Sequence, residues 1–263
     1  MRTKKIAAAA AVVVLAAVII AAVVTQRGNG QATAADRKEV VISAAASLKD
    51  GLEDIAALYE QEHPAVDLVM NYGASGTLQK QIEQGAPADL FLSAGEKQMK
   101  ALETKGLISR RADLLKNELV VVVPSGSGTL ASLKELTGER YKRIAVGQPE
   151  AVPAGEYARQ SLTATGVWEQ LDGKLVFVKD VRQVLSYVET GNAEAGLVYR
   201  TDALTSDKVD IAAPVEESSH EPILYPAGVI KDAAHESEAD AFLEYLESEA
   251  AIKIFEGYGF KRP

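Results

Sequence analysis

From Glu39 onward, short apolar runs alternate with amphipathic stretches, and this alternation already restricts the chain to few architectures. Short runs of Val, Ile and Leu are typical of buried strands, whereas apolar residues spaced three and four apart form one face of a helix. When strands and helices alternate along a chain, the strands form sheets and the helices cover their faces. The pattern therefore predicts an α/β fold.

The expected elements follow one another along the whole chain. Apolar runs that fit strands occupy residues 40–43, 66–72, 90–92, 119–123, 144–147, 175–178, 195–198 and 223–230. One helix is expected to begin at Ser47, another follows the turn at residues 73–76, and others cover residues 96–105, 153–165, 181–189 and 238–255. A chain of 263 residues is long enough for two modest cores.

Charge and composition exclude several classes of protein. A net charge of -9 argues against a nucleic-acid partner, because phosphate backbones are bound through dense Lys and Arg patches. The chain has no cysteine, which excludes disulfides, thiolate metal sites and cysteine nucleophiles. Ser75 lies in Gly-Ala-Ser-Gly-Thr, which lacks the second glycine of a nucleophile elbow, and no nucleotide-binding glycine motif is present.

The N-terminus carries an export signal. Arg2, Lys4 and Lys5 precede an unbroken apolar run at residues 6–24. This run is long enough to stay in the membrane as an anchor, and Ala32-Thr33-Ala34 offers small residues for cleavage, so both outcomes stay open. We expect residues 1–37 to be a signal or anchor plus a linker, and the folded part to be periplasmic or at the cell surface.

Two serines follow expected strands at the start of a helix, where α/β proteins bind ligands. At such a position the hydroxyl and the backbone N–H of Ser47 or Ser75 would point at one spot, and the helix dipole favours an anion there. The alternative is that each serine caps its own helix, with Asp50 as the capping-box acid after Ser47. For a single serine, capping is the more common role.

Seven short segments considered together are more informative than either serine. They are Ala-Ala-Ala-Ser-Leu (44–48), Gly-Ala-Ser-Gly-Thr-Leu (73–78), Gly-Ala-Pro-Ala-Asp-Leu-Phe (85–91), Val-Pro-Ala-Gly-Glu-Tyr-Ala (152–158), Asp-Val-Arg (180–182), Gly-Leu-Val-Tyr (196–199) and Thr-Asp-Ala (201–203). In sequence and in order they resemble the loops of the molybdate-binding proteins of ABC importers. The resemblance extends over nearly the whole exported part.

The resemblance implies a two-lobed periplasmic binding protein fold, in which each lobe is a mixed sheet flanked by helices. Lobe I would comprise residues 38–118 and 227–263, and lobe II residues 119–226. The implied ligand is molybdate or tungstate, without a cofactor or a directly coordinated metal. The implied partner is an importer permease with its ATPase. We expect a monomer with no enzymatic activity.

The resemblance also implies which residues bind the ion. The implied ligand residues are Ser47, Ser75, Ala154, Val181 and Tyr199. The serines would give hydroxyl and backbone N–H groups, the tyrosine its phenol, and the other two a backbone N–H at a helix start. Pro153 suits a first helical turn, and Asp180 can cap the next helix.

Each of these assignments has an ordinary structural alternative. Ala154 and Val181 are also plain residues for a helix start, and a tyrosine after a buried strand, as at Tyr199, is usually a core residue. Arg182 is either a charge behind the ligand residues or a solvated surface arginine.

Four alternative functions share part of this pattern. The same scaffold could bind another oxyanion or a small organic anion, and Ser47 or Ser75 could be the nucleophile of a hydrolase. The effector lobe of a transcription regulator would need a helix-turn-helix where the export signal lies. Porphobilinogen deaminases need a cysteine for their cofactor, and this chain has none.

Overall fold

The computed structural model describes residues 37–263, so the predicted signal or anchor lies outside the described residues. Residues 39–263 form one unit built around two five-stranded sheets. Among the helices described, none is long and apolar enough to cross a membrane.

The first sheet has the strand order β2-β1-β3-β10-β4. Its strands are β1 (Lys38–Ala45), β2 (Val66–Gly73), β3 (Leu90–Leu92), β4 (Ile108–Lys116) and β10 (Leu224–Ile230). β1 and β3 are parallel, whereas β10 runs antiparallel to both of its neighbours, β3 and β4. The sheet is therefore mixed.

The second sheet has the order β7-β6-β8-β5-β9. Its strands are β5 (Leu119–Pro124), β6 (Ile144–Gly147), β7 (Leu175–Val178), β8 (Ala195–Tyr199) and β9 (Val209–Pro214). β6 is parallel to β7 and β8, and β5 is antiparallel to β8 and β9. Two mixed sheets flanked by helices confirm the predicted two-lobed fold.

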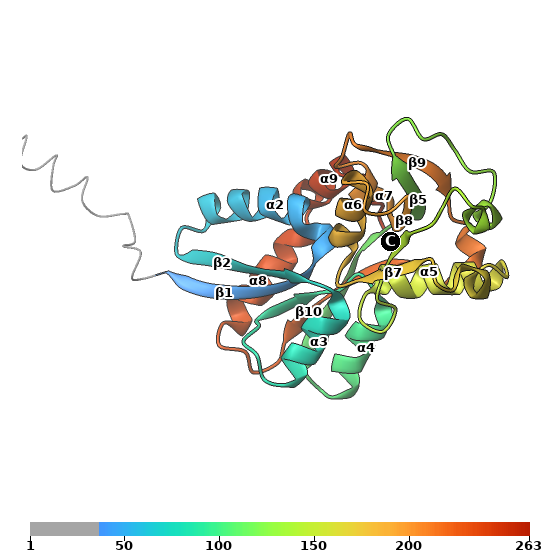
Figure 1. The fold of residues 1–263 in the computed structure, drawn as a ribbon. Helices are drawn as coiled ribbons and strands as arrows, with labels where there is room; N and C mark the ends of the chain where they lie inside the picture. The colour runs from blue at the N-terminus through green and yellow to red at the C-terminus, as the bar shows by residue number, and fades with distance from the viewer. Residues whose placement is uncertain (1–36) are drawn as a thin grey trace, which may run out of the picture. The chain divides into compact units, whose positions relative to one another are not determined.

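Helices cover both faces of the first sheet, as Figure 1 shows for α2 (Lys49–Glu62) on one side and α3 (Ser75–Glu83) and α4 (Glu96–Thr104) on the other. Successive residues of a strand point to opposite faces. Leu90 and Leu92 accordingly share the main core with α2, while Phe91 packs in a second cluster with Leu78 of α3 and Met99 of α4. Both faces are apolar because both are buried.

The second sheet carries α5 (Pro153–Ala164), α6 (Val181–Glu189) and the short α7 (Arg200–Ala203). Each of these helices begins soon after a strand of that sheet ends: α5 follows β6, α6 follows β7 and α7 follows β8. This connectivity brings the helix starts to the carboxyl ends of neighbouring strands, where ligands bind in α/β proteins.

Some elements differ from the sequence prediction. β4 and β9, both edge strands, were not predicted, and β4 carries Arg110, Arg111 and Asp113 in place of an apolar run. The helix expected at residues 238–255 is two helices, α8 (Glu236–Leu246) and α9 (Glu249–Gly257). They are separated because Ser248 caps α9, its Oγ accepting the Ala251 N–H at 3.3 Å.

The chain passes between the sheets twice. The first passage is residues 117–118, between β4 and β5, and the second is residues 215–223, between β9 and β10. β10 joins the first sheet from Leu224 on. The lobe limits drawn from the sequence stay a prediction.

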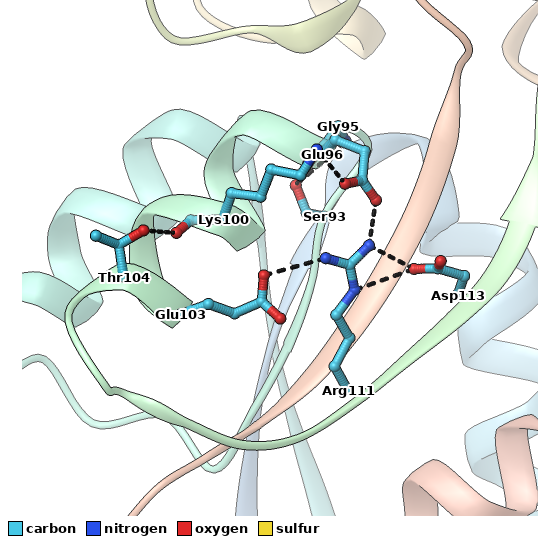
Figure 2. Close-up of polar contacts among 8 residues, drawn as sticks. All are labelled: Ser93, Gly95, Glu96, Lys100, Glu103, Thr104, Arg111 and Asp113. Carbon is cyan, nitrogen blue, oxygen red and sulfur yellow. Dashed lines mark hydrogen bonds and ion pairs between the residues drawn. The ribbon is translucent and has the colours of Figure 1, made fainter.

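Arg111 fixes the position of α4 against β4. Its guanidinium lies 3.1 Å from Glu103 Oε2 and 2.7 Å from Asp113 Oδ1, and it also pairs with Glu96 (Figure 2). Next to this cluster, the Ser93 hydroxyl donates to the Gly95 carbonyl at 2.7 Å. These contacts hold the loop that presents Ala94 between β3 and α4.

Candidate functional site

The five residues predicted to bind the ion line one small cavity. Ser47, Ser75, Ala154, Val181 and Tyr199 share it with Ala45, Ala46, Gly73, Ala74, Ala94, Val152, Pro153 and Asp180. The residues come from loops and helix starts that belong to both sheets. Tertiary structure therefore brings together groups that are up to about 150 residues apart in the chain.

Three helices begin at this cavity. Ser75 is the first residue of α3, Val181 is the first of α6, and Ala154 follows Pro153 at the start of α5. The first N–H groups of a helix have no partner within it, and the helix dipole adds partial positive charge there. Convergence of three such ends favours an anion.

Asp180 is the only charged residue among those that line this cavity, within the part of the chain described here. As predicted, it caps α6: its Oδ1 accepts the N–H of Gln183 at 2.8 Å. The prediction of Pro153 in the first turn of α5 is also confirmed. Any attraction for an anion must therefore come from oriented dipoles and not from a basic side chain.

Ala94 holds two hydroxyls of the site. Its N–H donates to Ser75 Oγ at 3.0 Å, which leaves the serine proton to point elsewhere. The Tyr199 hydroxyl donates to the Ala94 carbonyl at 3.2 Å, a contact between a residue of the second sheet and the loop after β3. Burial raises the pKa of Tyr199 well above its ordinary value, so this hydroxyl keeps its proton and acts as a donor.

The capping alternatives for the two serines are wrong. Ser47 lies in a short 3-10 helix, Ala46–Leu48, and α2 begins only at Lys49. Its hydroxyl lies 3.0 Å from the Tyr225 hydroxyl and makes no cap. The residue before α3 is Ala74, so Ser75 does not cap that helix either. Both hydroxyls are thus available to the cavity.

Besides the contact between Tyr199 and Ala94, two more contacts join the lobes beside the cavity. The Gly76 N–H, in the first turn of α3, donates to the Ala151 carbonyl at 2.9 Å. The guanidinium of Arg182, on α6, pairs with Asp50 of α2, so Arg182 is not a solvated surface residue. The predicted capping-box acid Asp50 is therefore engaged in an ion pair across the lobes.

Arg182 has a second acidic partner. Its Nε lies 2.7 Å from Oδ1 of Asp202, with the two atoms off the line of a hydrogen bond, so the contact is purely an ion pair. Asp202 is fully buried, and burial raises the pKa of its carboxyl to about 7 although Arg182 opposes this. The sequence analysis included Asp202 in the segment 201–203 without giving it a role, and it missed Tyr225, which no local motif marks.

No metal centre is evident: residues 37–263 contain no group of three or more His, Cys, Asp and Glu that could hold a metal ion. The histidines lie elsewhere. His63 stacks on Tyr59, and His220 lies near Tyr157 with its ring next to the Glu221 carbonyl. The cavity is suited to hold a small anion through neutral donors.

Comparison with known proteins identifies the class. Residues 40–261 match the family described as bacterial extracellular solute-binding proteins. The match covers nearly all of the described chain. The chain therefore belongs to this family of binding proteins, and the recognition made from the loop motifs is confirmed.

Individual relatives narrow the comparison to ABC importers. A Bacillus subtilis protein named as an ABC transporter substrate-binding lipoprotein is 49% identical, covering 88% of this chain and 90% of the relative. The molybdate-binding protein of Escherichia coli is 41% identical, covering 86% and 90%. The periplasmic molybdate-binding protein of Azotobacter vinelandii superposes with a TM-score of 0.77 at 25% identity, covering 85% and 99%.

Proposed function

We propose that this protein captures molybdate, and tungstate as well, outside the cytoplasm and delivers it to an ABC importer. The observation that carries the proposal is the cavity in which two serine hydroxyls, one tyrosine hydroxyl and three helix starts meet without a basic side chain. The names of the Escherichia coli and Azotobacter vinelandii relatives support the choice of ion.

We assign the ligand contacts to one set of residues, the anion cage, which comprises Ser47, Ser75, Ala154, Val181 and Tyr199. Ser47 and Ser75 would each donate a hydroxyl and a backbone N–H, and Tyr199 its phenol proton. Ala154 and Val181 would each donate a backbone N–H. A hydrogen bond to a charged group contributes about 1.5 to 3 kcal/mol, so a set of such donors can hold a dianion without a buried lysine or arginine.

Tyr199 must change partner for this role. A phenol has one proton, and in the structure it points to the Ala94 carbonyl. Binding would therefore turn that proton toward the ion, and the Ala94 loop would keep its other contact, with Ser75. Donors from both lobes would then bridge the ion and stabilise the closed arrangement.

The size and the protonation state of the oxyanion would decide which ions bind. Donors aimed at a larger tetrahedron would be stretched around sulfate, which would bind more weakly. Protonated phosphate needs an acceptor for its proton. Asp180 lines the cavity and caps α6 through its Oδ1. None of the five residues of the anion cage carries a carboxylate, so we expect phosphate to be rejected.

The decisive experiment is calorimetric titration of the fragment that starts near Lys38 with molybdate, tungstate, sulfate and phosphate. We expect one molybdate or tungstate per chain and at least about 100-fold weaker binding of sulfate and phosphate, because each misplaced donor loses about 1.5 to 3 kcal/mol. Tighter binding of sulfate, phosphate or a small organic anion would assign the protein to that ligand instead.

A hydrolase is not favoured. The hydroxyl of Ser47 contacts Tyr225, and that of Ser75 contacts the Ala94 N–H, and neither partner is a general base at neutral pH. We therefore propose binding without catalysis, with a permease and its ATPase as partners and the monomer as the working form. Residues 1–37 would supply the export signal or the anchor.

Closure of the two lobes is tested at Gly76. A Cβ at this position would lie 2.7 Å from the Ala151 carbonyl oxygen and 2.9 Å from the Ala151 Cα, both of them backbone atoms of the other lobe. Gly76→Ala should hold the lobes apart and weaken molybdate binding about tenfold or more, because less of the protein would reach the closed state. Calorimetric titration measures the loss of affinity, and small-angle scattering with and without molybdate measures whether the lobes close.

Gly257→Ala is the matched control, because a Cβ there meets no atom within 4 Å and Gly257 ends α9. This variant should bind and close like the unmodified protein. If Gly76→Ala also binds and closes normally, the contact between Gly76 and Ala151 does not control closure.

A further inference from the structure

A buried row of side chains leads from the passage between the sheets to the anion cage. Asn117 lies in the first passage, between β4 and β5. Its Nδ2 donates to Thr201 Oγ1 at 2.9 Å and to the Tyr225 hydroxyl at 3.1 Å. The Tyr225 hydroxyl in turn lies 3.0 Å from Ser47 Oγ. All four side chains are buried, so water does not compete for these bonds.

The backbone sets the orientation of the Asn117 amide. The N–H of Glu118 donates to Asn117 Oδ1 at 2.9 Å. A backbone N–H can only donate, so the amide oxygen must face it and the amide nitrogen must face Tyr225. The lone pair of the Tyr225 oxygen that faces Asn117 is therefore occupied by a donated proton.

The Tyr225 proton then has one partner among these groups. Burial raises the pKa of Tyr225 well above its ordinary value, so the hydroxyl is protonated. Asn117 donates and cannot accept through its nitrogen, and the Tyr199 hydroxyl, which also interacts with Tyr225, gives its own proton to the Ala94 carbonyl. We assign Ser47 Oγ, 3.0 Å away, as the acceptor of the Tyr225 proton. Ser47 accepts from Tyr225 and keeps its own proton free to point into the cavity.

We infer that Asn117 and Tyr225 are positioning residues that direct the Ser47 hydroxyl proton at the bound oxyanion. The inference rests on the proposed function, since it concerns the same cage. The hydrogen bonds all run in one direction: the Asn117 amide donates to the Tyr225 phenol, the phenol donates to Ser47, and Ser47 donates to the ligand. If these hydrogen bonds ran in the opposite direction, a lone pair of Ser47 would face the anion in place of its proton.

Asn117→Asp should reverse the direction of these hydrogen bonds with almost no change in the shape of the side chain. A carboxylate only accepts, so it would take the Glu118 N–H as before and also the Tyr225 proton. Tyr225 would then accept from Ser47, and Ser47 would face the ion with lone pairs. We expect molybdate affinity to fall about 100-fold, the effect of losing a charged hydrogen bond and adding repulsion.

The added negative charge alone would also weaken anion binding, and a double-mutant cycle with Tyr225→Phe separates the two effects. Without the phenol the chain of hydrogen bonds is cut, so the Asn117→Asp substitution can no longer reverse the Ser47 hydroxyl. In the Tyr225→Phe background, this substitution should cost less than about tenfold, from its charge alone. Calorimetric titration in buffer well above the ordinary carboxyl pKa measures all four proteins.

Equal losses from Asn117→Asp in both backgrounds, or no loss in either, would overturn the inference. If the unmodified protein binds none of the oxyanions, the proposed function itself fails, so the two failures are distinguishable. Tyr258→Phe is the control for a lost phenol, because its hydroxyl bonds to Asp54 at 2.6 Å outside the cavity. This variant should bind molybdate normally.

Thermal unfolding shows whether each variant folds. If Asn117→Asp does not fold, the effect of Tyr225→Phe on molybdate affinity is measured twice, once in a protein that keeps Ser47 and once in a protein that carries Ser47→Ala. The inference requires that loss of the phenol weaken molybdate binding only while the serine hydroxyl is present. An equal loss in both chains contradicts it.

Discussion

A Ser47→Ala, Ser75→Ala double variant is expected to lose molybdate binding almost completely. Each substitution removes a hydroxyl donor of the anion cage. The acceptor side of Ser75 is occupied by the Ala94 N–H, and that of Ser47 by Tyr225 in the inferred chain of hydrogen bonds. Each hydrogen bond to a charged ligand contributes about 1.5 to 3 kcal/mol, so the double loss should weaken affinity at least about 100-fold. Calorimetric titration with molybdate measures it directly.

Ser161→Ala provides the control for this variant. Ser161 is also a buried serine, but its hydroxyl bonds back to the Tyr157 carbonyl within α5 at 2.9 Å and does not line the cavity. It should bind molybdate like the unmodified protein. Unchanged affinity in the double serine variant would remove both serines from the binding site.

Gly155→Ala should disturb both folding and binding. A Cβ at position 155 would lie 1.9 Å from the Gly147 carbonyl oxygen and 2.5 Å from its carbon, which are backbone atoms at the end of β6. The first turn of α5 would have to move away from the sheet, and the Ala154 N–H would move with it. We expect unfolding free energy to fall by about 1 to 3 kcal/mol or more, as in overpacked cores.

Molybdate binding should weaken as well, because the start of α5 would no longer place the Ala154 N–H where the ion requires it. A misplaced donor corresponds to about a tenfold loss of molybdate affinity or more. Denaturant unfolding measures the free energy of unfolding, and calorimetric titration measures the molybdate affinity independently. Gly257→Ala again serves as the neutral glycine replacement; if Gly155→Ala matches it in stability and affinity, α5 does not need this close approach.

Much of the fold could be predicted because its signals are local. The apolar runs of β3, β6, β7 and β8 and the starts of α5 and α6 depend on neighbouring residues, such as the cap formed by Asp180. Two of the edge strands, β4 and β9, gave no such signal. β4 pairs with one strand only, so its Arg110 and Arg111 can meet solvent and carboxylates where a central strand would need apolar residues.

The candidate site also has a part that could be predicted from local motifs and a part that could not. Loop motifs were enough to predict the five cage residues, which the structure places around one cavity, while their contacts with an ion stay a proposal. The neighbours of those residues could not be predicted. Asp50 looked like a capping acid, yet it pairs with Arg182 of the other lobe.

What the sequence alone determined was the α/β class, the order of most elements and the set of loops that meet at the site. Hydropathy spacing, caps and short motifs carry that information because they act between residues close in the chain. Only the tertiary structure decided which groups touch Ser47. Tyr225 is 178 residues away, so the direction in which the serine proton points depends on a contact that exists only after the chain has folded.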